Sequence, residues 1–272
     1  MEGLSSFDPP REPPPTKPEP NVTYVSMMVY NPEDPSPPIQ RIKWLLTLLD
    51  AKLPLVLYVC AFYRKLLGNH PFLNTTVVDL DLEATEIMRH VRGAEQRVAP
   101  NPLKLPEHRN AKKDTVFFCG LMGVKTELVA RAVRDGLVRT PFVAFLDASI
   151  AKVLREPIRS LGELRDLSVS GTLTVPLIPG CRVPAAPWPG REELASRICW
   201  MFCGGFFLLP AAKAMEWHVR CREGLLEFLR EGRITWEVNV WAAVVSETPG
   251  LVAWFLADHD ERMLRIPDTW KN

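Results

Sequence analysis

Short apolar runs alternate with longer segments of helical periodicity through the first half of the chain. Runs rich in apolar, β-branched and aromatic residues predict strands at residues 22–30, 55–60, 75–80 and 142–146, of which 55–60 and 142–146 are expected to be buried. Apolar residues spaced three and four apart predict helices at residues 39–50, 61–68, 82–92 and 115–134. Because strands that alternate with helices in this way form parallel sheets, the pattern predicts an α/β fold with a mainly parallel central sheet flanked by helices.

The second half of the chain has a less regular pattern. The expected strands are one or two at residues 168–178, a glycine-broken pair at 198–209 and a last strand at 251–256. The expected helices lie at 211–232 and 236–246, and the expected loops at 93–114 and 179–190, with a polar tail after the last strand. A loop as long as 93–114 in a compact domain indicates function or mobility.

Residues 1–21 differ from the rest of the chain in composition. They contain seven of the 26 prolines and almost no apolar side chains, which predicts a disordered or polyproline-like segment. The segment also lacks the apolar core of a secretory signal. The most apolar window, residues 44–62, is interrupted by charged residues and a proline, so it predicts a helix, a turn and a strand and no membrane span. The folded domain is therefore expected at residues 22–272.

Charge and cysteine content narrow the classes of function. The formal net charge is +1, so no overall field attracts nucleic acid or an anionic membrane. The six cysteines form no Cys-x-x-Cys pair, and Cys60 and Cys119 lie inside apolar runs, as is typical of buried free thiols. These features predict a cytoplasmic protein of a reducing compartment, without a nucleic-acid partner.

The most informative candidate site is the end of the strand at residues 142–146. Asp147 ends this apolar run and Ser149 follows two positions later, so both side chains are expected to project the same way. Open α/β sheets bind ligands at the carboxyl ends of their strands, and a hard cation carrying phosphate oxygens prefers such an oxygen pair. An ordinary aspartate turn at the end of a strand remains an equal alternative.

Two other segments offer charged candidates. Asp79 and Asp81 form a literal Asp-x-Asp after a predicted strand, although the neighbouring acidic residues favour the first turn of a helix. The cations of residues 108–113 are more typical of a solvated face. Lys125 interrupts an apolar helical run, so we expect it to reach along the helix to a phosphate.

The last third of the chain adds three candidates. Gly204 and Gly205 interrupt an aromatic strand, which indicates either a bulge or the close approach of a ligand. Glu237 stands in the first turn of a helix that Thr235 is expected to cap, and it serves either the helix dipole or base catalysis beside an indole. His259 lies between two aspartates, a pattern that is more often surface than metal ligand.

Several of these segments resemble known glycosyltransferases. The sequence FVAFLDASIAK resembles the Asp-x-Asp strand of GT-A enzymes such as the glycogenin-like group, with Ser149 in place of the second aspartate. The order of segments across residues 22–262 is similar to that of the HtrL/YibB (WlaTC-like) family of bacterial and large-virus proteins, regarded as glycosyltransferases. The matching segments are the first strand, the Arg41-bearing helix, LPLVLYV, RNAKKDT with Lys125, FVAFLDASIAK, CGGFFLL and GRITWEVNVW.

The resemblance implies a single GT-A-like domain that binds a UDP- or GDP-sugar donor, a carbohydrate acceptor and a divalent cation, Mn²⁺ or Mg²⁺. It implies that Asp147 holds the metal and the diphosphate, that Ser149 contacts the metal directly or through water, and that Lys125 neutralises donor phosphate. His259 or a neighbouring aspartate would be a late metal ligand. Because a hydroxyl is a weaker ligand than a carboxylate, Ser149 predicts weak metal binding, or a site where cationic side chains replace the metal.

The remaining roles also follow from the resemblance. They are Asp147 and Glu237 as catalytic residues, Glu237 as base or acceptor contact, Tyr30 and Asn110 on the donor side, and Gly204, Gly205 and Trp236 on the sugar or acceptor side. Two alternatives stay open. One is a non-catalytic relative that binds glycans or nucleotide sugars. The other is a metal-dependent nucleotidyltransferase or phosphohydrolase that uses Asp79, Asp81 and Asp147.

Overall fold

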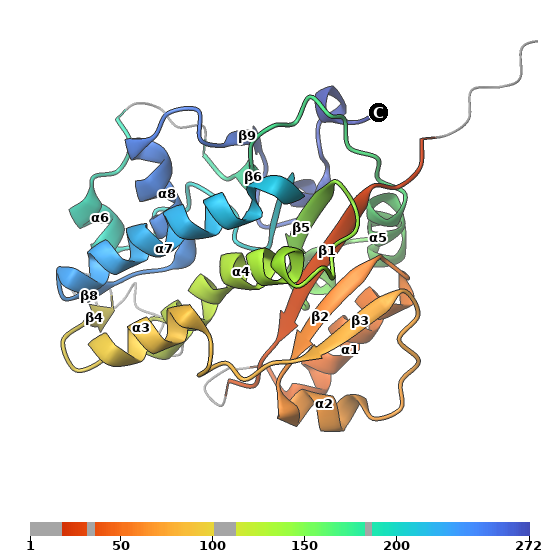
Figure 1. Cartoon of the computed structure of the whole chain (residues 1–272), viewed down its shortest axis with the longest axis horizontal. Helices are drawn as coiled ribbons and strands as arrows, with labels where there is room; N and C mark the ends of the chain where they lie inside the picture. Colours follow the sequence, from red (N-terminus) through yellow and green to blue (C-terminus); the bar gives the residue numbers. More distant parts are fainter. Residues whose placement is uncertain (1–17, 32–35, 101–112, 183–186) are drawn as a thin grey trace, which may run out of the picture.

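The computed structural model describes residues 18–31, 36–100, 113–182 and 187–272, and its centre is a seven-stranded sheet (Figure 1). The strands are β1 (Val22–Met28), β2 (Leu55–Val59), β3 (Thr75–Asp79), β5 (Phe142–Leu146), β6 (Leu177–Gly180), β7 (Phe206–Pro210) and β9 (Ala253–Leu256), in the order β3-β2-β1-β5-β7-β6-β9. Strand β7 runs antiparallel to both of its neighbours, and the other strands of this sheet are parallel. The predicted α/β fold with a mainly parallel sheet is confirmed.

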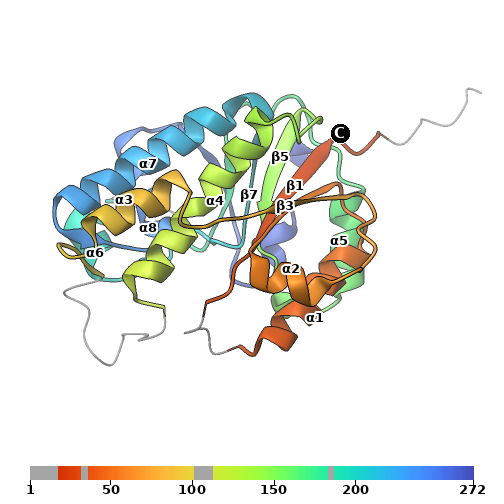
Figure 2. The ribbon, with the colours of Figure 1, turned by 60° about the horizontal axis from the view of Figure 1, so that its bottom comes forward.

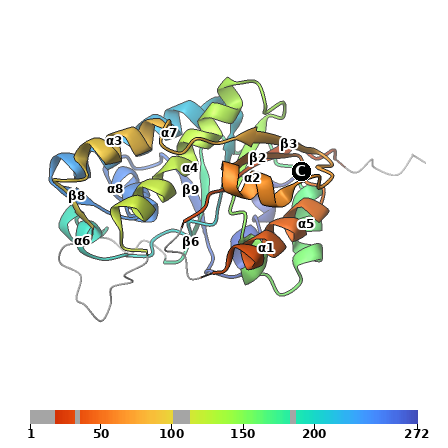
Figure 3. The ribbon, with the colours of Figure 1, turned by 90° about the horizontal axis from the view of Figure 1, so that it is seen from below.

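Helices cover both faces of the sheet, as Figures 2 and 3 show. One face carries α1 (Pro38–Asp50), α2 (Ala61–Leu67) and α5 (Pro157–Arg165), and the other α3 (Glu86–Ala94), α4 (Val116–Arg134), α7 (Ala214–Arg230) and α8 (Glu237–Glu247). The short helix α6 (Arg191–Ser196) contacts α8, and the two-residue strands β4 (Ala99–Pro100) and β8 (Arg233–Ile234) pair beside α7.

Alternation along the strands separates the interior into two apolar cores. In β5, Val143 and Phe145 face the core under α4 and α7, whereas Phe142, Ala144 and Leu146 face the core under α1 and α5. Every residue of β5 is buried, because both of its faces are covered. This double burial explains why the strand appears in the sequence as a continuous apolar run.

The order of the strands creates a switch point between β1 and β5. From β1 the chain moves outward through β2 and β3, and it then returns to place β5 on the other side of β1, with Tyr24 opposite Ala144. In open parallel sheets such a reversal leaves a crevice at the carboxyl ends of the two strands, where ligands bind. The residues after Met28 and after Leu146 therefore meet at the position expected for a site.

The structure corrects several of the predicted elements. Only Leu177 and Ile178 of the predicted strands at 168–178 lie in β6, apart from a single bridge from Val169 to Lys271. Residues 198–205 form no strand pair: residues 198–200 are irregular, Phe202 forms one bridge with Gly180, and Gly204 and Gly205 lie in the turn before β7. The polar tail is also folded: Met263, Leu264 and Ile266 are buried in the core under α1 and α5.

The predicted start of the folded domain agrees with the structure. The first described strand begins at Val22, as predicted, whereas the predicted disorder of 1–21 falls mostly on residues outside the described ranges. The middle of the predicted loop at 93–114 is also outside them. None of the helices in the described part of the chain combines the length and apolar character that crossing a membrane requires.

Candidate functional site

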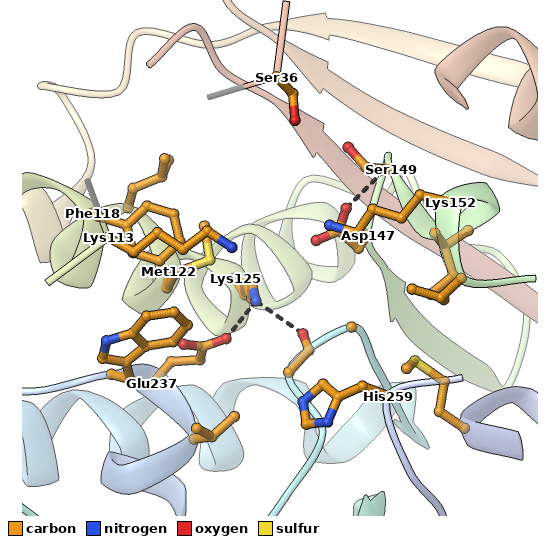
Figure 4. Close-up of a pocket in the computed structure, with 18 of the residues that line it drawn as sticks. Ser36, Lys113, Phe118, Met122, Lys125, Asp147, Ser149, Lys152, Glu237 and His259 are labelled. Carbon is orange, nitrogen blue, oxygen red and sulfur yellow. Dashed lines mark hydrogen bonds and ion pairs between the residues drawn. The ribbon is translucent and has the colours of Figure 1, made fainter. Parts of the chain in front are cut away.

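A cavity of about 230 Å³ opens at the switch point (Figure 4). The loop after β1 contributes Asn31 and Ser36, and the residues after β5 contribute Asp147, Ser149 and Lys152. Its other walls come from the first turns of α1, one face of α4, the start of α8 and the loops before β7 and after β9. The cavity thus draws on segments from most of the chain, and Asp147 lies in it as the sequence predicts.

Asp147 combines a turn with a place in the cavity wall. Its Oδ1 accepts a hydrogen bond from the Ser149 N–H at 2.7 Å, and its own N–H donates to the Gly205 carbonyl at 2.9 Å. The aspartate turn considered from the sequence is therefore present. The carboxylate nevertheless remains half-buried beside the cavity, so the turn and a binding role are compatible.

The charges around Asp147 keep it ionised. Burial raises the pKa of the carboxyl, but the cations of Lys152, Lys125 and Arg41 and the Ser149 N–H lower it by more, so the pKa lies below the ordinary value. Among the described residues of the cavity wall, four Lys or Arg side chains stand against the two carboxylates of Asp147 and Glu237. This excess of positive charge favours an anionic ligand.

Lys125 and Glu237 form a buried ion pair in the wall of the cavity. Lys125 Nζ lies 2.5 Å from Glu237 Oε1 and also donates to the Gly204 carbonyl at 2.9 Å. The two side chains are only 3% and 4% exposed. Lys125 was expected to reach a phosphate, but its ammonium is held by a carboxylate and a carbonyl of the protein; in the view of Figure 4 it lies between Asp147 and Glu237.

The second carboxylate oxygen of Glu237 is exceptional. Oε2 is buried and has no hydrogen-bond partner among the residues that the structure describes. Buried carboxylate oxygens are nearly always hydrogen-bonded, so one without a partner in a cavity wall indicates a position for a ligand donor. Glu237 is also the first residue of α8, where the helix dipole stabilises a negative charge, as the sequence predicts.

Gly204 makes room for this ion pair, and Gly205 makes room for Met263. A Cβ on Gly204 would collide with Glu237 Oε1, and one on Gly205 would lie 3.0 Å from Met263 Sδ. The sequence indicated a bulge or a close approach within a strand. The structure shows a turn that ends at β7, and the group that closely approaches Gly204 is a carboxylate of the protein itself.

Aromatic residues form one side of the cavity. Trp236 packs on Phe118 and Trp200, with ring centroids 5.1 and 5.7 Å apart, and its Nε1 donates to Asp114 Oδ1 at 2.9 Å. Thr235 was expected to cap α8, but Trp236 occupies the capping position and the Thr235 hydroxyl donates to the Leu194 carbonyl. Flat apolar rings beside cationic groups suit a sugar or a base attached to phosphate.

Four of the candidates from the sequence are not placed in this cavity. Asp79 is exposed and pairs with Arg64, and Asp81 Oδ1 accepts from the Glu83 N–H. Strand β3 is three strands away from β5, roughly 14 Å at the usual spacing, so Asp79 and Asp147 cannot ligate one metal. Tyr30 is 40% exposed and stacks on Phe62 outside the cavity wall. Asn110 lies outside the described residues.

His259 lines the cavity but is turned toward sulfur. Its Nδ1 lies 3.5 Å from Cys181 Sγ, and Cys181 Sγ lies 3.1 Å from Cys203 Sγ. The Cys203 contact and His259 lower the pKa of Cys181 to about 6, and the contact with Cys181 raises the pKa of Cys203 and of His259. Among the described His, Cys, Asp and Glu side chains, this trio is the cluster compact enough for a metal, and Asp147 does not belong to it.

Several cavity residues escaped the sequence analysis. Lys152 and Arg41 were not predicted as site residues, although Lys152 follows β5 and Arg41 lies in the helix after β1, and both strands end at the cavity. A cation shortly after such a strand end is a signal that could have identified Lys152, whereas Arg41 lies in α1 and carried no comparable signal. Cys181 and Cys203 carried no signal, because their partners are 22 and 78 positions away in sequence.

Comparison with known proteins does not assign this cavity to a family. No protein-family model matches the chain, and no curated protein matches it either. The HtrL/YibB resemblance therefore stays a prediction, and the function has to be inferred from the chemistry of the cavity.

Proposed function

We propose that the protein is a GT-A-like glycosyltransferase, related to the HtrL/YibB family, that moves a sugar from a UDP- or GDP-sugar to a carbohydrate acceptor. The observation that carries the proposal is the presence of two carboxylates, those of Asp147 and Glu237, among the cations of one cavity at the switch point. Asp147 is ionised among cations, and Glu237 has a buried oxygen without a partner in the described structure. Such a cavity suits a diphosphate at one end and a hydroxyl donor at the other.

On the donor side, Asp147 supplies one carboxylate for Mn²⁺ or Mg²⁺. The fit is limited, because among the described residues Asp147 belongs to no compact group of three or more His, Cys, Asp or Glu side chains. It is still sufficient for Mg²⁺, which commonly binds one or two carboxylates and takes its other ligands from substrate phosphates and water. Lys152 and Arg41 add positive charge, and this charge stabilises the departing nucleoside diphosphate.

On the acceptor side, Glu237 acts as the base. Lys125, which also donates to the Gly204 carbonyl, donates to its Oε1, and this leaves Oε2 to accept the proton of the acceptor hydroxyl. As this proton moves to Oε2, the hydroxyl oxygen forms a bond with the anomeric carbon, and the bond from that carbon to the diphosphate oxygen breaks. This course belongs to an inverting transfer. In a retaining transfer Glu237 would only position the acceptor.

One observation favours a non-catalytic binding protein as a second candidate. The Lys125–Glu237 pair is satisfied within the protein on the Lys125 side, as in a structural ion pair. A protein that binds nucleotide sugars without turnover would keep the cationic wall around Asp147 and would need no base. A nucleotidyltransferase that uses Asp79, Asp81 and Asp147 together has no support, because these carboxylates do not converge.

The reaction class is tested by incubating the full chain with a panel of UDP- and GDP-sugars in the presence of Mn²⁺ or Mg²⁺. The proposal predicts release of a nucleoside diphosphate from at least one donor, with or without an added glycan acceptor. Binding of a nucleotide without turnover of any donor would favour the binding protein. Release of a nucleoside monophosphate would contradict glycosyl transfer.

A further inference from the structure

Three soft metal-ligand side chains meet at the carboxyl edge of the sheet, next to the cavity. Cys181 follows β6, Cys203 precedes the turn into β7, and His259 follows β9. Their ligand atoms all lie within 4.8 Å of one another. In tetrahedral zinc sites two ligand atoms lie about 3.5–3.8 Å apart. The 3.5 Å from Cys181 Sγ to His259 Nδ1 matches this spacing, whereas the 3.1 Å between the two sulfurs would have to lengthen by about 0.7 Å on binding.

The backbone brings these three segments together independently of any metal. Cys181 N–H donates to Met201 O at 3.0 Å, and Cys203 N–H donates to Pro179 O at 2.8 Å. On the other side, β6 pairs in parallel with β9, and Ala257 N–H donates to Gly180 O at 2.8 Å. Backbone pairing therefore positions the segments that carry the three ligands, each of which lies just outside a strand.

We propose that Cys181, Cys203 and His259 bind one Zn²⁺ through two thiolates and one imidazole, with water at the fourth position. Thiolate and imidazole ligands favour Zn²⁺, whereas Mn²⁺ and Mg²⁺ prefer oxygen, so this site is distinct from the one proposed at Asp147. We do not include Asp258 as the fourth ligand. One oxygen of its carboxylate accepts from the backbone N–H of His259, and the other pairs with Arg262. On binding, both thiols lose their protons to solvent.

A disulfide is the competing use of the two cysteines. Cys181 and Cys203 flank the Gly180–Phe202 bridge diagonally. Diagonal neighbours of an antiparallel pair are usually about 7–8 Å apart, whereas a disulfide spans Cα atoms about 4.4–6.8 Å apart. The third ligand, His259, also has no part in a disulfide. The sulfurs nevertheless lie 3.1 Å apart, so the observation that favours a bridging ion is the approach of His259 Nδ1 to within 3.5 Å of Cys181 Sγ.

The position of the site gives the ion a structural effect on the cavity. Cys203 directly precedes Gly204, whose carbonyl holds Lys125, and the ring of His259 packs edge-on against Trp200 with centroids 4.4 Å apart. Zinc would fix the Gly204 turn and the aromatic wall relative to each other. The proposal does not depend on glycosyl transfer, and its test needs no substrate.

The experiment uses the reduced full chain, freed of metal with a chelator and titrated with Zn²⁺ or Co²⁺. We expect one Zn²⁺ per chain to remain bound through gel filtration, and one equivalent of Co²⁺ to give the sulfur-to-cobalt charge-transfer absorption. Cys181→Ser, Cys203→Ser and His259→Gln should each weaken metal binding at least about tenfold. Cys60→Ser, which changes another half-buried thiol, should bind metal like the wild type.

Two results would overturn the proposal without any variant. One is a reduced wild-type chain that retains no Zn²⁺ and gives no cobalt–sulfur absorption. The other is mass spectrometry of the protein as purified that shows a Cys181–Cys203 disulfide and no metal. Undiminished binding by all three variants, with folding checked by circular dichroism, would also overturn it, because the ligands would then lie elsewhere.

Discussion

Lys125 Nζ and Glu237 Oε1 lie 2.5 Å apart with both side chains almost completely buried, and the pair joins α4 to the start of α8 at the cavity. A buried ion pair is costly to form, because both charges lose their hydration. We therefore infer that the pair holds the Glu237 carboxylate in a fixed direction at the cavity and does more than stabilise the fold. Replacing a member of the pair should therefore change the stability of the folded protein.

Replacing one partner of the pair should destabilise the protein strongly. Lys125→Met leaves Glu237 as an uncompensated buried charge, and we expect the free energy of unfolding to fall by about 3–5 kcal/mol. Lys125→Met combined with Glu237→Leu should recover most of this loss. Urea unfolding of the three proteins measures both values. Equal losses in the single and double variants would show that no uncompensated charge is involved.

Gly204 should tolerate no side chain. In Gly204→Ala the new methyl group meets the Glu237 carboxylate, and the ion pair has to shift. Overpacking of this kind costs about 1–3 kcal/mol. Gly171→Ala is the matched control, because a Cβ there meets nothing within 4 Å, and it should change stability by less than about 0.5 kcal/mol. Thermal unfolding of the two variants measures their stability relative to the wild type. Equal losses of stability would contradict the proposed crowding at Gly204.

His218 should make stability fall in mild acid. Burial lowers its pKa, and the nearby Glu127 and Glu86 only partly offset this effect. The folded state therefore binds fewer protons than the unfolded state below about pH 6.5, so stability is complete above this pH and decreases as the pH falls toward the folded-state pKa. His218→Gln should decrease less between about pH 7 and pH 5. Urea unfolding of both proteins at these two pH values measures the difference. If both lose the same free energy of unfolding between them, His218 is not the cause of the loss.

The strands of the first half were predictable because each is a short run of β-branched and apolar residues. Strands β1, β2 and β5 are buried throughout, whereas the edge strand β3 is partly exposed. Residues 142–146 and 55–59 form β5 and β2, almost as their sequences indicate. The region after β5 was harder, because its structure depends on distant partners. Phe202 gains its bridge from Gly180, and Val169 gains its bridge from Lys271 at the far end of the chain.

Part of the candidate site could also be predicted from the sequence, and part of it could not. Asp147 was predictable because strand ends at a switch point are determined by local sequence and by strand order. Lys125 and Glu237 were each identified, but their contact was not, since 112 positions separate them. The Cys181–Cys203–His259 cluster follows from the pairing of β6 with its neighbours, which no local pattern encodes.

The most direct test of the central claim compares Asp147→Asn with Asp79→Asn in the release of nucleoside diphosphate from a nucleotide sugar. The amide introduced by Asp147→Asn keeps an oxygen that can accept from the Ser149 N–H, so this variant removes the charge and retains the turn. The account predicts a rate at least about 100-fold lower for Asp147→Asn and an unchanged rate for Asp79→Asn. A normal rate in Asp147→Asn with a large loss in Asp79→Asn would contradict it.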